Sequence, residues 1–140
     1  TLEPEIRSAY VLPFAWPLLT AISCGVVVFA VTTLFSAQIT SWFIDSSYPA
    51  HDLAVKGLPL FASGFVCFGI NIVSIGYFQS VERDRPAMAI TLLRGFILIL
   101  FCFWLMPILW GVPGIWLAVP VSELLTFLFV ITIYCRRKRS

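Results

Sequence analysis

Four long apolar runs, separated by short polar or basic segments, constrain the fold of this chain more than any other feature. Each run reaches about 20 residues, the length that an α-helix needs to cross a hydrocarbon core of about 30 Å. The chain is 60% hydrophobic and only 11% charged, whereas an average soluble domain has roughly 25% charged residues. Because the runs are continuously apolar and do not alternate, they predict helices and not barrel strands. The predicted fold is an all-α, polytopic membrane helical bundle.

Prolines help to place the ends of the crossings, since a proline costs little in the first turn of a helix and about 3 kcal/mol or more inside it. Pro13 and Pro17 suggest that the first turns of the first apolar run lie at the membrane interface. Pro59 is expected in the first turn of the second crossing, and Pro86 at the start of the third. The WGVPG segment, residues 110–114, is the expected turn before the fourth. The predicted crossings are residues 18–43, 58–79, 86–109 and 115–135.

The basic residues indicate the orientation, because Lys and Arg collect in cytoplasmic loops. Arg7 precedes the first crossing, two arginines lie between the second and third, and residues 136–140 form a basic tail. The loop at residues 44–57 contains one lysine, Lys56, and no arginine. Both termini are therefore predicted cytoplasmic, with a multi-pass location in the inner (plasma) membrane and residues 44–57 external. Basic residues spread along the membrane boundary give no support to nucleic-acid binding.

The residue types that carry covalent or metal chemistry are not arranged for it. The four cysteines lie within or at the ends of the apolar runs without a C-x-x-C pair, so they are predicted to be free thiols. His51 is alone in the external loop and is expected to be a solvated side chain without a function. The sequence shows no nucleophile beside a base, no phosphate-binding glycine loop and no carboxylate pair. It predicts neither an enzyme nor a metal or cofactor site.

Polar residues in the second crossing follow a helical spacing. Ser63, Cys67, Asn71 and Ser74 recur at intervals of four, four and three, which places them on one face. That face is expected to point inward, because a polar group in hydrocarbon without a partner costs on the order of several kcal/mol. Two interpretations are open: close helix packing through small polar residues, or the wall of a water-filled or substrate-filled cavity. Asn71 has the strongest need for partners, because its amide can make up to about four hydrogen bonds.

Arg94 and Glu123 are charged residues deep inside predicted crossings. Arg94 follows Pro86 by eight residues and Glu123 follows Ile115 by eight, so each lies about 12 Å from its own side of the membrane. In a core of about 30 Å their depths differ by about 6 Å, which two long side chains can span. A pair is favoured because an arginine alone at mid-helix costs about 2.5 to 3.5 kcal/mol. The alternative is that Arg94 reaches the inner headgroups and Glu123 faces a loop or a water pocket.

Pro120 lies one helical turn before Glu123. A proline at this position cannot donate to the carbonyl of Trp116, so one backbone oxygen is freed and a kink is expected. Transporters use interrupted helices with freed polar groups near a midplane acid to bind coupling ions and to gate. This pattern alone predicts the helical bundle of a transporter or channel with a polar interior.

A series of motifs runs through residues 77–123. An aromatic-Phe-Gln-Ser segment ends the second crossing, an arginine lies inside the third with a proline near its outer end, and a Gly-x-x-Gly-x-Trp turn leads to Pro-x-Ser-Glu. In this order and spacing the chain resembles the last helices of the MATE multidrug and toxic compound extrusion transporters; the loop at residues 44–58 resembles that family more loosely. The matching residues are Tyr77, Phe78, Gln79, Arg94, Pro107, Gly111, Gly114, Trp116, Pro120, Ser122 and Glu123.

The resemblance implies that the chain supplies helices nine to twelve of a twelve-helix protein. The opening residues TLEPEIRSAY look like a loop entering a helix and not like a targeting segment, so further helices are expected upstream. The implied function is multidrug efflux by proton- or sodium-coupled antiport, with alternating access between two lobes and no cofactor besides the coupling ion. The implied partners are membrane lipid, small organic cationic or amphipathic substrates, and the missing N-terminal helices of the same protein.

One departure bears on the coupling ion. Some MATE branches carry an acidic residue in the tenth helix, and the crossing at residues 58–79 has none. Cation coupling is therefore expected to rest on Glu123 or on acids in the missing lobe. The wall of the substrate and cation pathway is expected to include Glu123, Asn71, Arg94, Ser63, Cys67 and Ser74, with Pro120 and Pro107 as kink or gating positions.

Other functions compete with this interpretation. A lipid or oligosaccharide flippase of the same superfamily would have the same helix arrangement but usually more cavity arginines and lysines than Arg94 alone. A complete four-helix multidrug pump would need an acid in its first helix, and residues 18–43 have none. A structural membrane subunit without transport activity is favoured if Arg94 and Glu123 only lock one packing arrangement. A membrane enzyme would need a second catalytic group beside Glu123.

Overall fold

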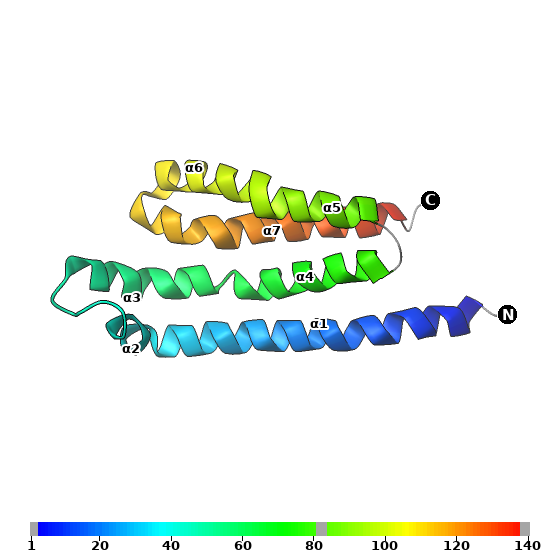
Figure 1. The fold of residues 1–140 in the computed structure, drawn as a ribbon, viewed down its shortest axis with the longest axis horizontal. Coiled ribbons are helices and arrows are strands. Elements are labelled where there is room, and N and C mark those ends of the chain that lie inside the picture. The colour runs from blue at the N-terminus through cyan, green and yellow to red at the C-terminus, as the bar shows by residue number, and fades with distance from the viewer. Residues whose placement is uncertain (1–2, 81–83, 138–140) are drawn as a thin grey trace.

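The computed structural model describes residues 3–80 and 84–137, and this part of the chain is helical, without strands. Four helical columns run alongside one another, and the first residues of the first column lie at the same end as the last residues of the fourth (Figure 1). The elements in chain order are α1 (Glu3–Leu34), α2 (Ser36–Ser41), α3 (Pro49–Ala62), α4 (Phe65–Ser80), α5 (Asp84–Leu92), the π-helical segment η1 (Leu93–Ile97), α6 (Leu98–Trp110) and α7 (Val112–Arg137).

Each column is long and apolar enough to cross a membrane. The all-α fold with four candidate membrane spans, as predicted, is thereby confirmed. Most large apolar side chains are exposed in this bundle, as expected where the surroundings are lipid and not water. The spans are Phe14–Leu34, Pro49–Ser80, Arg85–Trp110 and Val112–Ile133.

The first column lies earlier in the chain than the predicted crossing at residues 18–43. Helix α1 contains both Pro13 and Pro17 and ends at Leu34. The chain turns at Phe35, and the short helix α2 takes up residues that were expected inside the span. The prolines are four residues apart and share one helix face, and membrane helices tolerate such lost backbone bonds. The polar residues of SAQITS, residues 36–41, follow Phe35 directly and mark this change, but the predicted crossing continued through them to the apolar Trp42 and Phe43.

The second column begins earlier than predicted and is interrupted. Helix α3 starts at Pro49, with Asp52 in its first turn, and both are favourable at a helix start. Pro59 therefore lies inside α3 and not in a first turn, which corrects the expectation that the helix starts near residue 58. Between α3 and α4 the chain makes a turn at Ser63 and Gly64. The column is thus two helices in series.

The third column, α5–η1–α6, agrees with the predicted crossing at residues 86–109 to within a residue or two. The turn that follows is tighter than the predicted WGVPG segment. Gly111 alone separates α6 from α7, with a φ of 63° that favours glycine. Helix α7 then continues through Pro120 without a break, so the proline is accommodated inside a continuous helix. Of the predicted basic tail, α7 includes residues 136–137, and residues 138–140 lie outside the described part.

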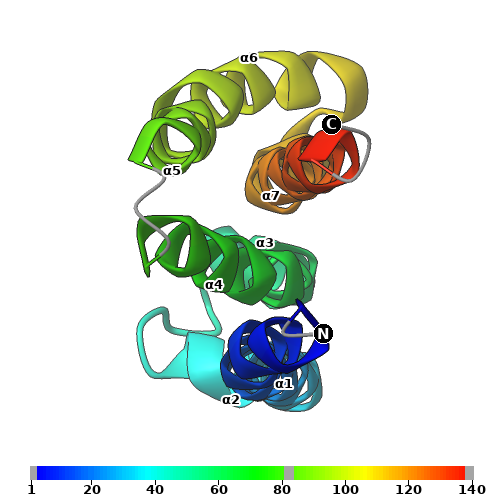
Figure 2. The ribbon, with the colours of Figure 1, turned by 90° about the vertical axis from the view of Figure 1, so that its right-hand side faces the viewer.

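Helix α4 lies between α1 on one side and α7 on the other, with α6 beyond α7 (Figure 2). Small residues bring α1 and α4 together: a Cβ added to Gly25 would lie 2.8 Å from the Cα of Val66, and one added to Gly69 would lie 3.0 Å from the carbonyl oxygen of Ala21. Two small apolar cores flank the polar centre of the bundle. One contains Phe78, Ala87, Ile90 and Val130, and the other Cys102, Met106 and Ala118.

At the end of the bundle away from the termini, α2 is tied to the start of α3. His51 is only 8% exposed, and its Nε2 lies 3.0 Å from the Ser41 hydroxyl oxygen. Its Nδ1 lies 3.8 Å from a carboxylate oxygen of Asp52. The expectation of a solvated histidine is therefore wrong: because α3 begins at Pro49, His51 is placed in a helix that packs against α2. The predicted free thiols are confirmed at all four cysteines.

Candidate functional site

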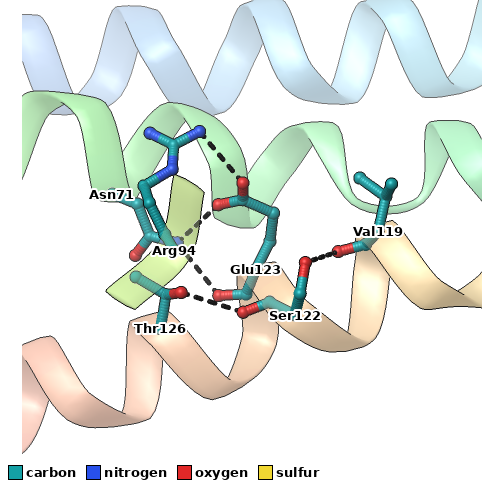
Figure 3. A network of polar contacts seen from close by, with 6 residues as sticks. All are labelled: Asn71, Arg94, Val119, Ser122, Glu123 and Thr126. Carbon is teal, nitrogen blue, oxygen red and sulfur yellow. Dashed lines mark hydrogen bonds and ion pairs between the residues drawn. The ribbon is translucent and has the colours of Figure 1, made fainter. Parts of the chain in front are cut away.

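The centre of the bundle holds a hydrogen-bonded network around Glu123, which is 4% exposed. The Nη2 of Arg94 donates to its Oε1 at 2.9 Å. The amide nitrogen of Asn71 donates to its Oε2 at 2.8 Å and to its backbone carbonyl at 2.9 Å. Figure 3 shows the three side chains converging from α4, η1 and α7. The pairing of Arg94 with Glu123 that their depths favoured is thus present in the structure.

Both side chains of the Arg94–Glu123 pair are largely buried. The side chain of Arg94 is 14% exposed and that of Glu123 is 5% exposed. Two charges removed from water to this extent are stable only if they are paired and hydrogen-bonded. Arg94 and Asn71 together give each carboxylate oxygen a donor, and the positive charge of Arg94 balances the negative charge of Glu123. The interpretation in which Arg94 reaches the headgroups and Glu123 faces water does not hold in this arrangement.

Arg94 has a second partner in Phe68 of α4. The guanidinium carbon lies 4.6 Å from the centroid of the Phe68 ring, within the range of a cation–π interaction. Phe68 in turn contacts Phe65 edge-on, with ring centroids 6.0 Å apart, and Phe65 contacts Phe61 in the same way at 5.8 Å. A short row of aromatic rings thus leads from α3 along α4 to the cation. The guanidinium is held between a ring face and a carboxylate.

The backbone that carries Arg94 is π-helical, over Leu93–Ile97. A π-helical turn contains an extra residue relative to an α-helix, and such turns are frequent at functional sites. Each residue in an α-helix advances the direction of the side chain by about 100°, so the insertion changes which residues of α5 and α6 share a face. Gly95 lies inside the turn, with nothing within 4 Å of where its Cβ would be. The position of Arg94 opposite Glu123 therefore depends on this irregular turn.

The residues of α3 and α4 that face α7 recur at intervals of seven in the sequence. This is the repeat that keeps one face of a helix against a neighbour. A Cβ on Gly64 would lie 3.0 Å from the Cα of Pro120, and one on Gly57 would overlap the indole of Trp116. The interruption at Ser63 and Gly64 therefore faces Pro120. The buried residues at these seven-residue intervals are Gly57, Gly64, Asn71 and Phe78. They lie against Trp116, Pro120, Glu123 and Val130, respectively.

The four polar residues predicted on one face do not share one environment. Ser63 is exposed, and its hydroxyl donates to the carbonyl of Leu60 at 2.6 Å. Ser74 is buried and donates to the carbonyl of Ile70 in its own helix at 2.8 Å. Cys67 is a partly buried free thiol. The face is not continuous because the helix is interrupted at Ser63, and among the four Asn71 alone bonds directly to Glu123.

Several residues of the sequence motifs have packing roles at the ends of the helices. The ring of Tyr77 lies 4.8 Å from that of Phe14, Phe78 is buried, and Gln79 is exposed. The backbone N–H of Gly111 donates to the carbonyl of Pro107 at 2.9 Å. These contacts of Tyr77, Phe78 and Gly111 thus lie toward the ends of α4 and α6.

Two further motif residues lie in α7 itself. A Cβ on Gly114 would overlap the carbonyl of Met106, so only glycine permits this approach of α7 to α6. The Ser122 hydroxyl is buried and donates to the carbonyl of Val119 at 2.8 Å (Figure 3). Ser122 is thus beside the site and bonded within its own helix.

The sequence reasoning missed two residues at the site. Phe68 was given no role, although it precedes Asn71 by three residues and therefore shares its face. Thr126 follows Glu123 by three residues, is fully buried, and donates to the carbonyl of Ser122 at 2.9 Å. Helical spacing from Asn71 and Glu123 would have identified both Phe68 and Thr126.

The Oδ1 of Asn71 is buried without a hydrogen-bond partner among the described residues.

Among the described residues, no three His, Cys, Asp or Glu side chains are grouped so that they could hold a metal ion. The comparisons with known proteins gave no match: no family model matches the sequence, and neither a curated protein nor a solved structure matches the chain. The site is therefore interpreted from its own geometry.

Proposed function

We propose that this chain is part of a secondary transporter of the MATE kind, which exports small organic cationic or amphipathic compounds in exchange for protons or sodium. The observation that carries the proposal is the buried network of Arg94, Glu123 and Asn71. Ionisable residues inside membrane-spanning helices are expensive and mark ion or substrate pathways. The resemblance of residues 77–123 to MATE motifs supports the same function. Both termini lie on the cytoplasmic side of the plasma membrane in this proposal.

The irregular backbone around the network supports a moving site over a static one. The interruption at Ser63 and Gly64 directly precedes α4, and the π-helical turn carries Arg94. Pro120 lies within the continuous helix α7, one turn before Glu123. Interrupted helices near a polar centre are the parts that rock or bend in alternating access. Coupling then works through Glu123: a proton or sodium ion that binds its carboxylate weakens the attraction to Arg94 and loosens α7 from η1.

A direct test is drug efflux by the full-length protein carrying Glu123→Gln, measured as ethidium extrusion from cells together with membrane abundance. The amide keeps the shape of the side chain but does not carry the charge. Efflux divided by membrane abundance should fall to background; abundance itself is expected to fall as well, because the variant loses the buried ion pair and a loss of about 1–2 kcal/mol can change abundance several-fold. Ser122→Ala is the matched control, because its hydroxyl bonds within α7 only.

A second candidate is a structural membrane subunit without transport activity. It is favoured by the closure of the network, in which both oxygens of the Glu123 carboxylate already have donors. In that case Glu123→Gln lowers abundance and leaves no separate effect on efflux. The same experiment thus distinguishes the two functions.

A further inference from the structure

Phe68 and Glu123 form two walls of a site for a cation, and the guanidinium of Arg94 occupies it. The Phe68 ring centroid is 4.6 Å from the guanidinium carbon, and the Glu123 Oε1 is 2.9 Å from Nη2. An aromatic face beside a carboxylate is a general means of recognising an organic cation, because the ring quadrupole and the negative charge attract the same ligand. The arrangement that binds Arg94 therefore fits other planar or bulky cations.

We propose that Arg94 is an internal competitor for the organic cation, so that substrate binds between Phe68 and Glu123 only after the guanidinium has moved away. The inference rests on the proposed export function and adds to it the residue Phe68 and the occupancy by Arg94. The carboxylate of Glu123 is 5% exposed while the pair is closed. A ligand reaches it by displacing Arg94.

The backbone allows this displacement without unfolding a helix. Arg94 lies in η1, where the regular α-helical ladder is already interrupted. Migration of the extra residue along the helix would rotate Arg94 by about 100° relative to α7. Gly95, next to it, has no neighbouring atoms within 4 Å of a Cβ position, so no side-chain packing at this residue holds the turn in place. Phe68 and Glu123 lie in the continuous α-helices α4 and α7, and the Phe68 ring contacts that of Phe65.

Competition by Arg94 should lower the affinity of the wild-type protein for an organic cation. The wild-type protein binds an organic cation weakly when closed, because the ligand must replace an interaction inside the protein. Removing only the charge of Arg94 should strengthen binding. Arg94→Gln is suited to this, since its amide can still donate to Glu123 while it no longer competes as a cation. Arg94→Lys keeps the competing charge and is the matched control.

The experiment measures binding of ethidium, an aromatic organic cation, to the purified full-length protein by fluorescence polarisation. We expect Arg94→Gln to bind ethidium at least about tenfold more tightly than wild type, and Arg94→Lys to resemble wild type. Adding Phe68→Leu to Arg94→Gln should weaken binding roughly threefold to thirtyfold, the range of a cation–π contact. Adding Phe96→Leu to Arg94→Gln instead should not weaken ethidium binding, because Phe96 is 67% exposed. Neutral phenanthridine should bind all variants alike.

A second measurement is used if Arg94→Gln is unstable after extraction. In Arg94→Ala the site is vacated, and added methylguanidinium should raise the thermal midpoint more than sodium chloride at equal ionic strength. Equal midpoints in the two salts would overturn the inference, as would unchanged ethidium affinity in Arg94→Gln or a gain that survives Phe68→Leu. Ethidium efflux by the wild-type protein is recorded alongside. If efflux is normal but Arg94→Gln does not bind ethidium more tightly, the competition by Arg94 is disproved and the transport function stands. If efflux is absent but Arg94→Gln binds ethidium more tightly, the cation site stands and the transport function is disproved.

Discussion

The amide nitrogen of Asn71 donates to both the carboxylate and the backbone carbonyl of Glu123, at 2.8 and 2.9 Å, across 52 residues of sequence. This double contact fixes the orientation of the amide, because the opposite orientation would place its oxygen against two acceptors. It joins α4 to α7 at the level where Arg94 joins η1 to α7. The packing of α4, η1 and α7 thus depends on one carboxylate.

Neutralising one member of the ion pair should destabilise the bundle more than exchanging the two charges. Arg94→Met or Glu123→Met leaves a buried charge without its partner, which costs about 3–5 kcal/mol. The exchanged protein, Arg94→Glu with Glu123→Arg, restores attraction and should recover part of that loss. The measurement is unfolding of purified protein in detergent mixtures of increasing SDS content. An exchanged protein no more stable than either single variant would contradict a direct contact.

Asn71→Leu should destabilise the protein by about 1–3 kcal/mol, since Glu123 loses a buried donor while the volume is nearly kept. Ser74→Ala is the control on the same helix. Its hydroxyl bonds only to Ile70, one turn earlier, so its loss should have a smaller effect. In a double-mutant cycle with Glu123→Gln, measured by the same unfolding assay, Asn71→Leu should show a coupling of about 0.5–3 kcal/mol. Additive effects would argue that the amide and the carboxylate act independently.

Gly57→Ala should destabilise the bundle, because the added methyl overlaps the indole of Trp116. Overpacking of this kind costs typically about 1–3 kcal/mol. Gly76→Ala is a matched control in the same column, with nothing within 4 Å of its Cβ position, and should stabilise by up to about 1 kcal/mol. Thermal unfolding of both variants checks the prediction. Combining Gly57→Ala with Trp116→Leu should recover part of the loss; no recovery would place the cause elsewhere.

Deleting Gly95 should disconnect Arg94 from Glu123. The deletion removes the extra residue of η1 and rotates the two halves of the third column by about 100° relative to each other. Gly95→Ala leaves the residue count unchanged, meets no neighbour within 4 Å, and should be tolerated. The measurement is whether Glu123→Gln still lowers stability in each background. In the deletion its effect should largely disappear, whereas a full effect would show that the π-helical turn does not position Arg94.

Hydropathy was sufficient to predict the four membrane spans, because a run of about 20 apolar residues has few stable alternatives to a membrane helix. It was not sufficient to place helix ends within such a run. The interruption at Ser63 lies within a continuously apolar run, and Pro59 was interpreted as a helix start although α3 begins at Pro49. Ends of this kind are decided by packing against neighbouring helices, which a single sequence does not contain.

The sequence by itself determined that Arg94 and Glu123 needed partners, since a charge in hydrocarbon is expensive wherever the helices pack, and their depths made each the natural partner of the other. The tertiary structure alone decided the rest of the site. Asn71 joins it and Ser63 does not, because the interruption of the column gives them different surroundings. The guanidinium lies over the ring of Phe68, and Arg94 is carried there by a π-helical turn. Composition and depth are properties of single segments, whereas this site is made by the rotation of three segments relative to one another.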